Sequence, residues 1–112
     1  MEKYINECGN ECFRGITEDT PFDAANFHLV EGRGDDVQYA LHTNLGSITV
    51  LDRLTGYQGY VRDTETGYRD MEGNFWLASG MRDVRESGVK TIGEAISWIK
   101  DKANTCNPDR NC

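Results

Sequence analysis

The chain has 112 residues and carries 19 Asp and Glu against 12 Lys and Arg, which gives a formal charge of −7. That length supports a single domain, residues 1–112, because two separate cores would each bury too little apolar surface. The acidic balance argues against direct nucleic-acid binding, which needs a basic surface to release counterions from phosphates. No run approaches the ~20 apolar residues of a membrane span. The first residues also lack a secretion signal, so we expect a cytoplasmic protein with no membrane partner.

The first half of the chain predicts strands after an irregular start. Residues 1–25 show no clean hydrophobic period and are interrupted by two glycines and a proline, so we expect an irregular N-terminal segment. Apolar and polar residues then alternate over 27–31 and 37–41, on either side of a glycine-rich stretch, which predicts a β-hairpin. Residues 47–51 are rich in β-branched side chains and predict the strongest strand.

The second half predicts further strands. Residues 75–79 are aromatic and apolar, and we expect them to pair with residues 66–70. Residues 81–85 are charged, which is typical of an edge strand because charge discourages further pairing.

A C-terminal helix is the clearest local prediction. Thr91 is a suitable N-cap, and Glu94 completes a capping box three residues later. The helix is expected to end near Asn104, which leaves residues 107–112 as a tail. Its apolar residues recur at helical spacing and form one stripe: Ile92, Ala95, Ile96, Ile99 and Ala103.

Strands followed by a single helix are typical of an α+β fold. We expect an antiparallel sheet of about five or six strands, with the C-terminal helix packed on one face. The predicted core consists of the apolar residues that fall on one face of these elements: Phe27, Leu29, Leu41, Ile48, Val50, Phe75, Leu77, Ile92, Ile96 and Ile99.

The four cysteines lie at the two ends of the chain, as Cys8 and Cys12 and as Cys106 and Cys112. Four thiolates brought together would make a tetrahedral zinc shell, but the spacing is not that of the usual zinc knuckle. Disulfides and free thiols are the alternatives, and a reducing cytosol favours free thiols. The sequence leaves these readings open, and we expect no cofactor.

The two histidines, His28 and His42, fall on facing strands of the predicted hairpin and are expected to be neighbours. A histidine pair with a carboxylate can bind a transition metal, but exposed cross-strand pairs are more common. The sequence contains no nucleophile elbow, metalloprotease motif or phosphate loop. We therefore expect a non-enzymatic protein and expect no catalytic residues.

Acidic residues and tyrosines suggest a partner-binding surface. Residues 1–36 hold nine Asp and Glu against three Lys and Arg, a net −6. Tyrosine supplies rigid amphipathic contact area, and carboxylates attract a basic partner. The alternatives are a solvated acidic face and tyrosines that pack on the sheet. The candidate residues are Glu18, Asp19, Asp23, Asp35, Asp36, Tyr57, Tyr60, Asp63, Glu65, Tyr68, Asp70 and Glu72.

The chain resembles small uncharacterised phage and prophage proteins over residues 46–106. The resemblance is carried by ITVLDR at 48–53, TGY at 55–57, DTETGYRD at 63–70, GNFWLASG at 73–80 and AISWIK at 95–100. It implies a genomic setting and no site residues. By analogy, small acidic phage proteins are often inhibitors of host nucleic-acid machinery, such as anti-CRISPR or antirestriction proteins.

Together these observations predict a small acidic binding protein that acts as a phage-type inhibitor. Its carboxylates would occupy a basic nucleic-acid-binding surface of a host protein or nucleoprotein complex. Two alternatives remain: a small module stabilised by zinc at the four cysteines, and a small enzyme acting near the two histidines. The oligomeric state stays open.

Overall fold

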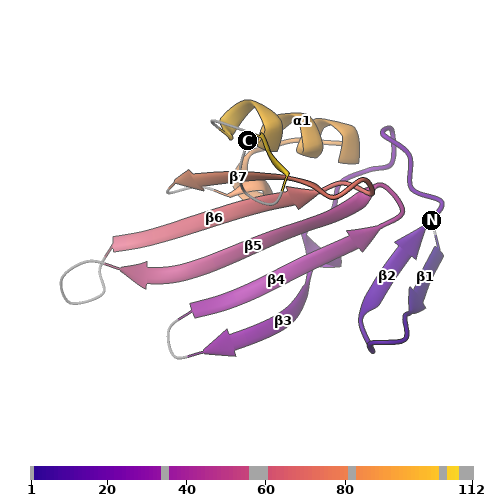
Figure 1. Ribbon diagram of the computed structural model, residues 1–112, viewed down its shortest axis with the longest axis horizontal. Coiled ribbons are helices and arrows are strands. Elements are labelled where there is room, and N and C mark those ends of the chain that lie inside the picture. Colours follow the sequence, from indigo (N-terminus) through magenta and orange to yellow (C-terminus); the bar gives the residue numbers. More distant parts are fainter. Residues whose placement is uncertain (1, 34–35, 56–60, 81–82, 104–105, 109–112) are drawn as a thin grey trace.

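The computed structural model describes residues 2–33, 36–55, 61–80, 83–103 and 106–108 (Figure 1). These residues form eight strands, one α-helix and two short 3-10 helices. The strands are β1 (Glu2–Ile5), β2 (Glu11–Arg14), β3 (His28–Arg33), β4 (Asp36–Thr43), β5 (Gly46–Thr55), β6 (Val61–Arg69), β7 (Asn74–Gly80) and β8 (Cys106–Pro108). The helices are η1 (Ala24–Asn26), η3 (Val84–Glu86) and α1 (Ile92–Lys102).

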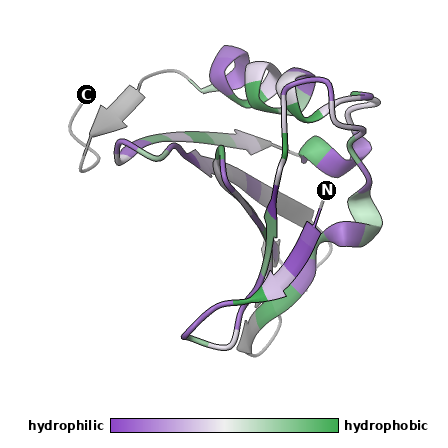
Figure 2. Cartoon of the chain, turned by 90° about the vertical axis from the view of Figure 1, so that its right-hand side faces the viewer, coloured by the Kyte–Doolittle hydropathy of each residue, from purple (hydrophilic) through white to green (hydrophobic). Residues whose placement is uncertain are grey.

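All eight strands belong to one sheet. Seven follow the order β1-β2-β4-β5-β6-β7-β8, and β3 pairs with β4 off this path. The described pairings are antiparallel except that of β2 with β4, which is parallel. The helix α1 lies over one face of the sheet, as Figure 2 shows. The predicted α+β fold with one C-terminal helix is therefore confirmed. Two parts of the prediction were wrong: the sheet is mixed and mostly antiparallel, not wholly antiparallel, and five or six strands was too low a number.

The additional strands are short and lie where the sequence has no alternating pattern. Two of them, β1 and β2, lie within residues 1–25, which we expected to be irregular. All four residues of β1 are exposed, so burial imposes no alternation on them. At the other end, β8 extends into the expected tail. The predicted edge strand at 81–85 is wrong where the structure describes it, because Val84 begins η3 and is fully buried.

The core lies between α1 and the sheet face that the helix covers. Strand register places Leu41 beside Ile48, and Ile48 beside Tyr68 on the next strand. Ile99 of the helix is fully buried in the same cluster. Each buried aliphatic side chain contributes about 1.5–3 kcal/mol to folding. The burial of these predicted core residues is confirmed for Leu41, Ile48, Val50, Ile92 and Ile99.

Some predicted core residues lie elsewhere. Leu29 is 61% exposed, and the register of β3 against β4 shifts immediately after it, at a bulge or irregularity. Phe75 is half-buried and lies on the face of the sheet opposite α1, where its ring covers Gly67. A Cβ at Gly67 would lie 2.9 Å from that ring, so the position requires glycine.

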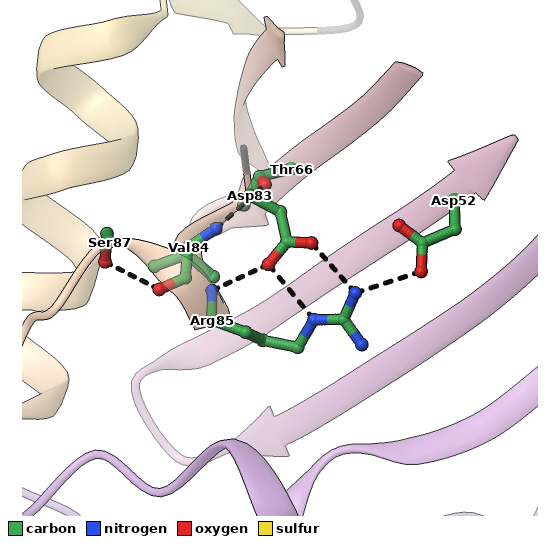
Figure 3. A network of polar contacts seen from close by, with 6 residues as sticks. All are labelled: Asp52, Thr66, Asp83, Val84, Arg85 and Ser87. Atoms are coloured by element: carbon green, nitrogen blue, oxygen red, sulfur yellow. Dashed lines mark hydrogen bonds and ion pairs between the residues drawn. The ribbon is translucent and has the colours of Figure 1, made fainter. Parts of the chain in front are cut away.

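A polar network fixes η3 against the sheet (Figure 3). The Arg85 guanidinium donates to both carboxylate oxygens of Asp83, at 3.0 and 2.8 Å, and to Asp52 at 3.0 Å. The Asp83 side chain is fully buried, and the paired guanidinium of Arg85 helps to compensate its charge there. Hydrogen bonds to Asp83, opposed by burial and supported by Asp52, raise the pKa of Arg85. The guanidinium also lies 4.9 Å from the centre of the Tyr39 ring.

The N-terminus of α1 is tied to residues 18–22. Thr91 Oγ1 accepts from the Glu94 backbone N–H at 3.1 Å, which confirms the predicted N-cap. The Ile92 and Gly93 backbone N–H groups donate to the carbonyl oxygens of Thr20 and Glu18, at 2.8 and 2.9 Å. The first N–H groups of the helix, which lack partners within it, are therefore satisfied by a segment far away in sequence.

The turn between β4 and β5 holds the start of that segment. Asn44 accepts the Ile16 backbone N–H at 2.8 Å and donates to the Ile16 carbonyl at 3.0 Å. The Asn44 side-chain amide therefore forms the two hydrogen bonds that a neighbouring strand would otherwise form with the backbone of the buried Ile16.

Among the helices that the structure describes, none is long and apolar enough to cross a bilayer.

Candidate functional site

A groove of about 530 Å³ runs between residues 18–19 and the exposed side of α1. Four carboxylate side chains and one indole line it, together with small and polar residues. The carboxylates belong to exposed residues and the indole is half-buried. They are Glu18, Asp19, Glu94, Asp101 and Trp98, which we call the acidic groove.

Helical spacing brings three of these residues together. Glu94, Trp98 and Asp101 stand at i, i+4 and i+7 on α1, which places them on one side of the helix. The buried residues Ala95 and Ile99 lie on the side that faces the sheet. Packing of the apolar stripe therefore orients the acidic side outward.

Gly93 allows the two groove residues that lie outside the helix, Glu18 and Asp19, to approach it. A Cβ at Gly93 would lie 2.8 Å from Glu18 Cβ and 2.9 Å from the Glu18 carbonyl oxygen. Real Cβ atoms do not approach other atoms this closely, so any larger residue would push the segment away. The absence of a side chain at this position is what seats Glu18 and Asp19 against α1.

The electrostatics of the acidic groove are uniformly negative. Among its described lining residues, none is Lys or Arg. Burial raises the pKa of Tyr68, and the charges of Asp70 and Glu18 raise it further. Lys100 Nζ lies 5.9 Å from the centre of the same ring, so charges of both signs surround Tyr68.

The structure uses two of the predicted acidic residues in turns. Asp23 accepts the Ala25 backbone N–H at 2.9 Å and caps η1. Asp70 accepts the backbone N–H groups of Glu72 and Asn74, both at 2.9 Å. Desolvation raises the pKa of Asp70, but these hydrogen bonds and that of the Asn74 side chain outweigh it and lower the pKa. Glu72 is exposed in the same turn.

Tyr68 does not present a surface for a partner. Its side chain is 5% exposed, its hydroxyl donates to the Leu45 carbonyl at 2.6 Å, and its ring stacks on Trp76 at 5.6 Å. The expectation of exposed contact area at this tyrosine was wrong, because register places it over the core. Glu65 is half-buried on the opposite face of the sheet, so the predicted residues do not all share one face.

The remaining predicted residues fall partly or wholly outside the described structure. Asp35, Tyr57 and Tyr60 lie outside the described residues. Asp36 and Asp63 contribute backbone to β4 and β6, but their side chains lie outside the description.

Sequence reasoning missed three members of the acidic groove. Glu94 was interpreted as part of a capping box, and its Oε1 does accept a backbone N–H, that of Lys90, at 3.2 Å. Trp98 was not considered as part of a surface, and Asp101 was not singled out. Their i, i+4, i+7 spacing opposite the apolar stripe was the available signal.

Three of the four cysteines lie in the part of the chain that the structure describes, and Cys112 lies outside it. Cys8 is exposed, Cys12 is buried, and both are free thiols. Cys12 lies on β2 and Cys106 on β8, five strand steps apart along the sheet path, so the strand order gives no support to a zinc shell that includes both. Among the described residues, no three of His, Cys, Asp and Glu are placed to hold a metal ion.

The two histidines are neighbours, as predicted. The rings of His28 and His42 lie 5.5 Å apart between centres. His42 Nδ1 lies 2.8 Å from Ser47 Oγ. Burial lowers the pKa of His42, and the nearby His28 lowers it further.

Comparison with family models, with curated proteins and with solved structures finds no match, so the function is argued from the geometry of the chain itself.

Proposed function

We propose that this chain is a non-enzymatic binding protein whose acidic groove takes a basic segment of a protein partner. One observation carries the proposal. Four exposed carboxylates surround a single indole in one groove, and no described lining residue carries a positive charge. The carboxylates attract the positive charge of Lys and Arg side chains at long range, and the indole can bind it at short range.

Long-range attraction comes from the carboxylates. At physiological salt, charges act over a screening length of about 8 Å, so a cluster attracts a basic partner and increases the association rate. Short-range affinity comes from Trp98, because an indole face binds an ammonium or guanidinium group with about 0.5–1 kcal/mol at exposed sites.

In its more specific form, the proposal is that the partner surface normally binds nucleic acid. Carboxylates of the acidic groove, together with Asp70 and Glu72 in the turn between β6 and β7, would then stand in for phosphates. The resemblance to phage and prophage proteins suggests a host complex as the partner, in a cytoplasmic setting. An anti-CRISPR or antirestriction role fits this form of the proposal.

Charge reversal in the groove tests the general proposal. The variant Glu18→Lys with Asp101→Lys reverses two groove charges. The control Glu7→Lys, which changes an exposed residue in the hairpin turn of β1 and β2, changes charge elsewhere. Affinity for a fluorescent Arg-rich peptide is measured by anisotropy over a range of salt concentrations. We expect the wild type to bind with a steep salt dependence, the control to bind similarly, and the groove variant to lose binding. Equal binding by the groove variant would overturn the proposal.

The nucleic-acid-mimic form needs a second measurement. Purified CRISPR effector and restriction enzymes are loaded with labelled target DNA, and displacement by the protein is followed by anisotropy. Displacement by the wild type and the Glu7→Lys control, but not by the groove variant, supports mimicry. Peptide binding without displacement of DNA from any of these complexes would leave a basic-segment binder and remove this mimicry.

A further inference from the structure

The two histidines form a pair on the sheet face that α1 does not cover. His28 is the register partner of Ala40, two residues before His42 on β4, so the two rings share a face. Their planes meet at 52° with 5.5 Å between centres. Two ionisable rings in contact, at the meeting point of several strands, are a feature that the proposed function does not use.

His28 is the unusual member of the pair. Both of its ring nitrogens are buried, and neither has a hydrogen-bond partner. Buried polar atoms in proteins are almost always paired, so the unpaired ring of His28 is costly where it lies.

The pair marks the place where the N-terminal hairpin joins the sheet. The hairpin of β1 and β2 contacts β4 through two register pairs, Cys12 with His42 and Phe13 with Thr43. Cys12 is 7% exposed and lies beside His42 on the same face. The other pair places Phe13 in the core. Two register pairs therefore join the hairpin to β4, and His42 belongs to one of them.

We propose that the His28–His42 pair makes attachment of the β1–β2 hairpin dependent on pH. With both rings neutral, they pack against each other and β2 pairs with β4. A proton on His42 places a charge beside the buried, unpaired ring nitrogens of His28. Opening the β2–β4 ladder exposes the rings to water and relieves that cost, so acid favours the detached hairpin.

The charged side chains that the structure describes on this face of the sheet come from β1, β2 and β6. Glu2 and Arg14 form an ion pair at 2.9 Å, and the Arg14 guanidinium lies 4.2 Å from the centre of the Tyr4 ring. Glu65 and Arg69 lie on β6; Arg69 is the register partner of Ser47, and its guanidinium lies over the Phe75 ring at 5.1 Å. The uncharged groups of the neighbouring strands on this face include Gln38, Ala40, Ser47, Thr49, Cys12 and Tyr4.

The direction of the effect follows from linkage. Burial and the neighbouring ring hold the pKa of His42 below its usual 6.5. An unfolded or detached segment binds a proton more readily than the packed one. The packed form is therefore favoured above the ordinary histidine pKa and loses stability as pH falls below it.

Hydrogen exchange on the intact protein tests this inference. Peptides covering β1–β2 and β5 are compared by mass spectrometry between about pH 7.5 and 5, the range in which histidine titrates, with labelling times corrected for intrinsic exchange. We expect protection of β2 to fall severalfold, while β5 stays protected. The variant His28→Phe removes the unpaired nitrogens and His42→Asn removes the ring with the lowered pKa, and each should reduce this fall.

A matched control keeps both rings. Lys3→Gln breaks the exposed ion pair with Glu11 in the same hairpin and should leave the pH dependence intact. Three results would overturn the inference: unchanged protection of β2 in the wild type, equal loss in β2 and β5, or an undiminished fall in both histidine variants. If a variant does not fold, the wild-type comparison of β2 with β5 and the remaining variant still decide the question.

Discussion

Replacing Gly93 by Ala has two opposed effects on the free energy of unfolding: it raises helix propensity, and it crowds the contact with Glu18. In an isolated helix the change would stabilise by about 1 kcal/mol. Here the new Cβ would lie 2.8 Å from Glu18 Cβ and 2.9 Å from the Glu18 carbonyl oxygen. The second atom belongs to the backbone and cannot rotate away. The segment must move, which breaks the 2.9 Å hydrogen bond from the Gly93 N–H.

The expected magnitude follows from these two costs. Overpacking of a close contact costs about 1–3 kcal/mol, and loss of the hydrogen bond costs about 1 kcal/mol more. After the propensity gain, Gly93→Ala should lower the free energy of unfolding by about 1–3 kcal/mol. The control Ser97→Ala, at an exposed position of the same helix, should be neutral or stabilise by about 0.5 kcal/mol.

Urea unfolding followed by tryptophan fluorescence measures both variants, because Trp98 lies on the affected helix. The Arg-rich peptide assay provides a second readout, since displacement of residues 18–19 opens the acidic groove. A Gly93→Ala protein as stable as the wild type, with unchanged peptide affinity, would refute the reasoning. It would show that residues 18–20 are not held against the helix as the structure places them.

Three further predictions concern the polar contacts. Arg85→Met removes the ion pair between Arg85 and the buried Asp83 and should lower the free energy of unfolding by about 3–5 kcal/mol; Asp83→Asn combined with it should restore part of that loss in the same urea measurement. Asn44→Ala removes both hydrogen bonds to Ile16 and should cost about 1–2 kcal/mol; a change within error in its urea midpoint would contradict this. Because the folded state lowers the pKa of Asp70, its ionised carboxylate stabilises the fold above pH ~4. This stabilisation is lost as pH falls further. The stability difference between wild type and Asp70→Asn should therefore shrink on acidification, as measured by thermal unfolding at several pH values.

Local signals predicted the elements that carry them. The N-cap at Thr91, the helix that follows it and the alternating strands β4 and β5 depend on nearby residues, so sequence was sufficient there. The strand β1 is wholly exposed and lacks any such signal. Leu29 was misplaced because the register of β3 shifts just after it, and a one-residue shift reverses every following side chain.

The acidic groove could be predicted only in part. Glu18 and Asp19 were chosen because of their charge, but their position depends on a close approach to Gly93, more than seventy residues away in sequence. No local pattern reports that contact. Tyr68 was misjudged for a similar reason, since its burial depends on Trp76 of the neighbouring strand.

The shared edge of β4 has a consequence for the order of assembly. Strands β3 and β2 lie end to end along it, with the pair at Ala40 followed by the pair at His42. Each pairing from β3 to β7 joins strands adjacent in sequence, whereas β2 must close a loop of about thirty residues at an entropic cost of about 3 kcal/mol. The N-terminal hairpin should therefore attach after strands β3 to β7 have paired. If β3 paired two residues further along the edge of β4, it would occupy the place of β2 and trap the chain in a misfolded state.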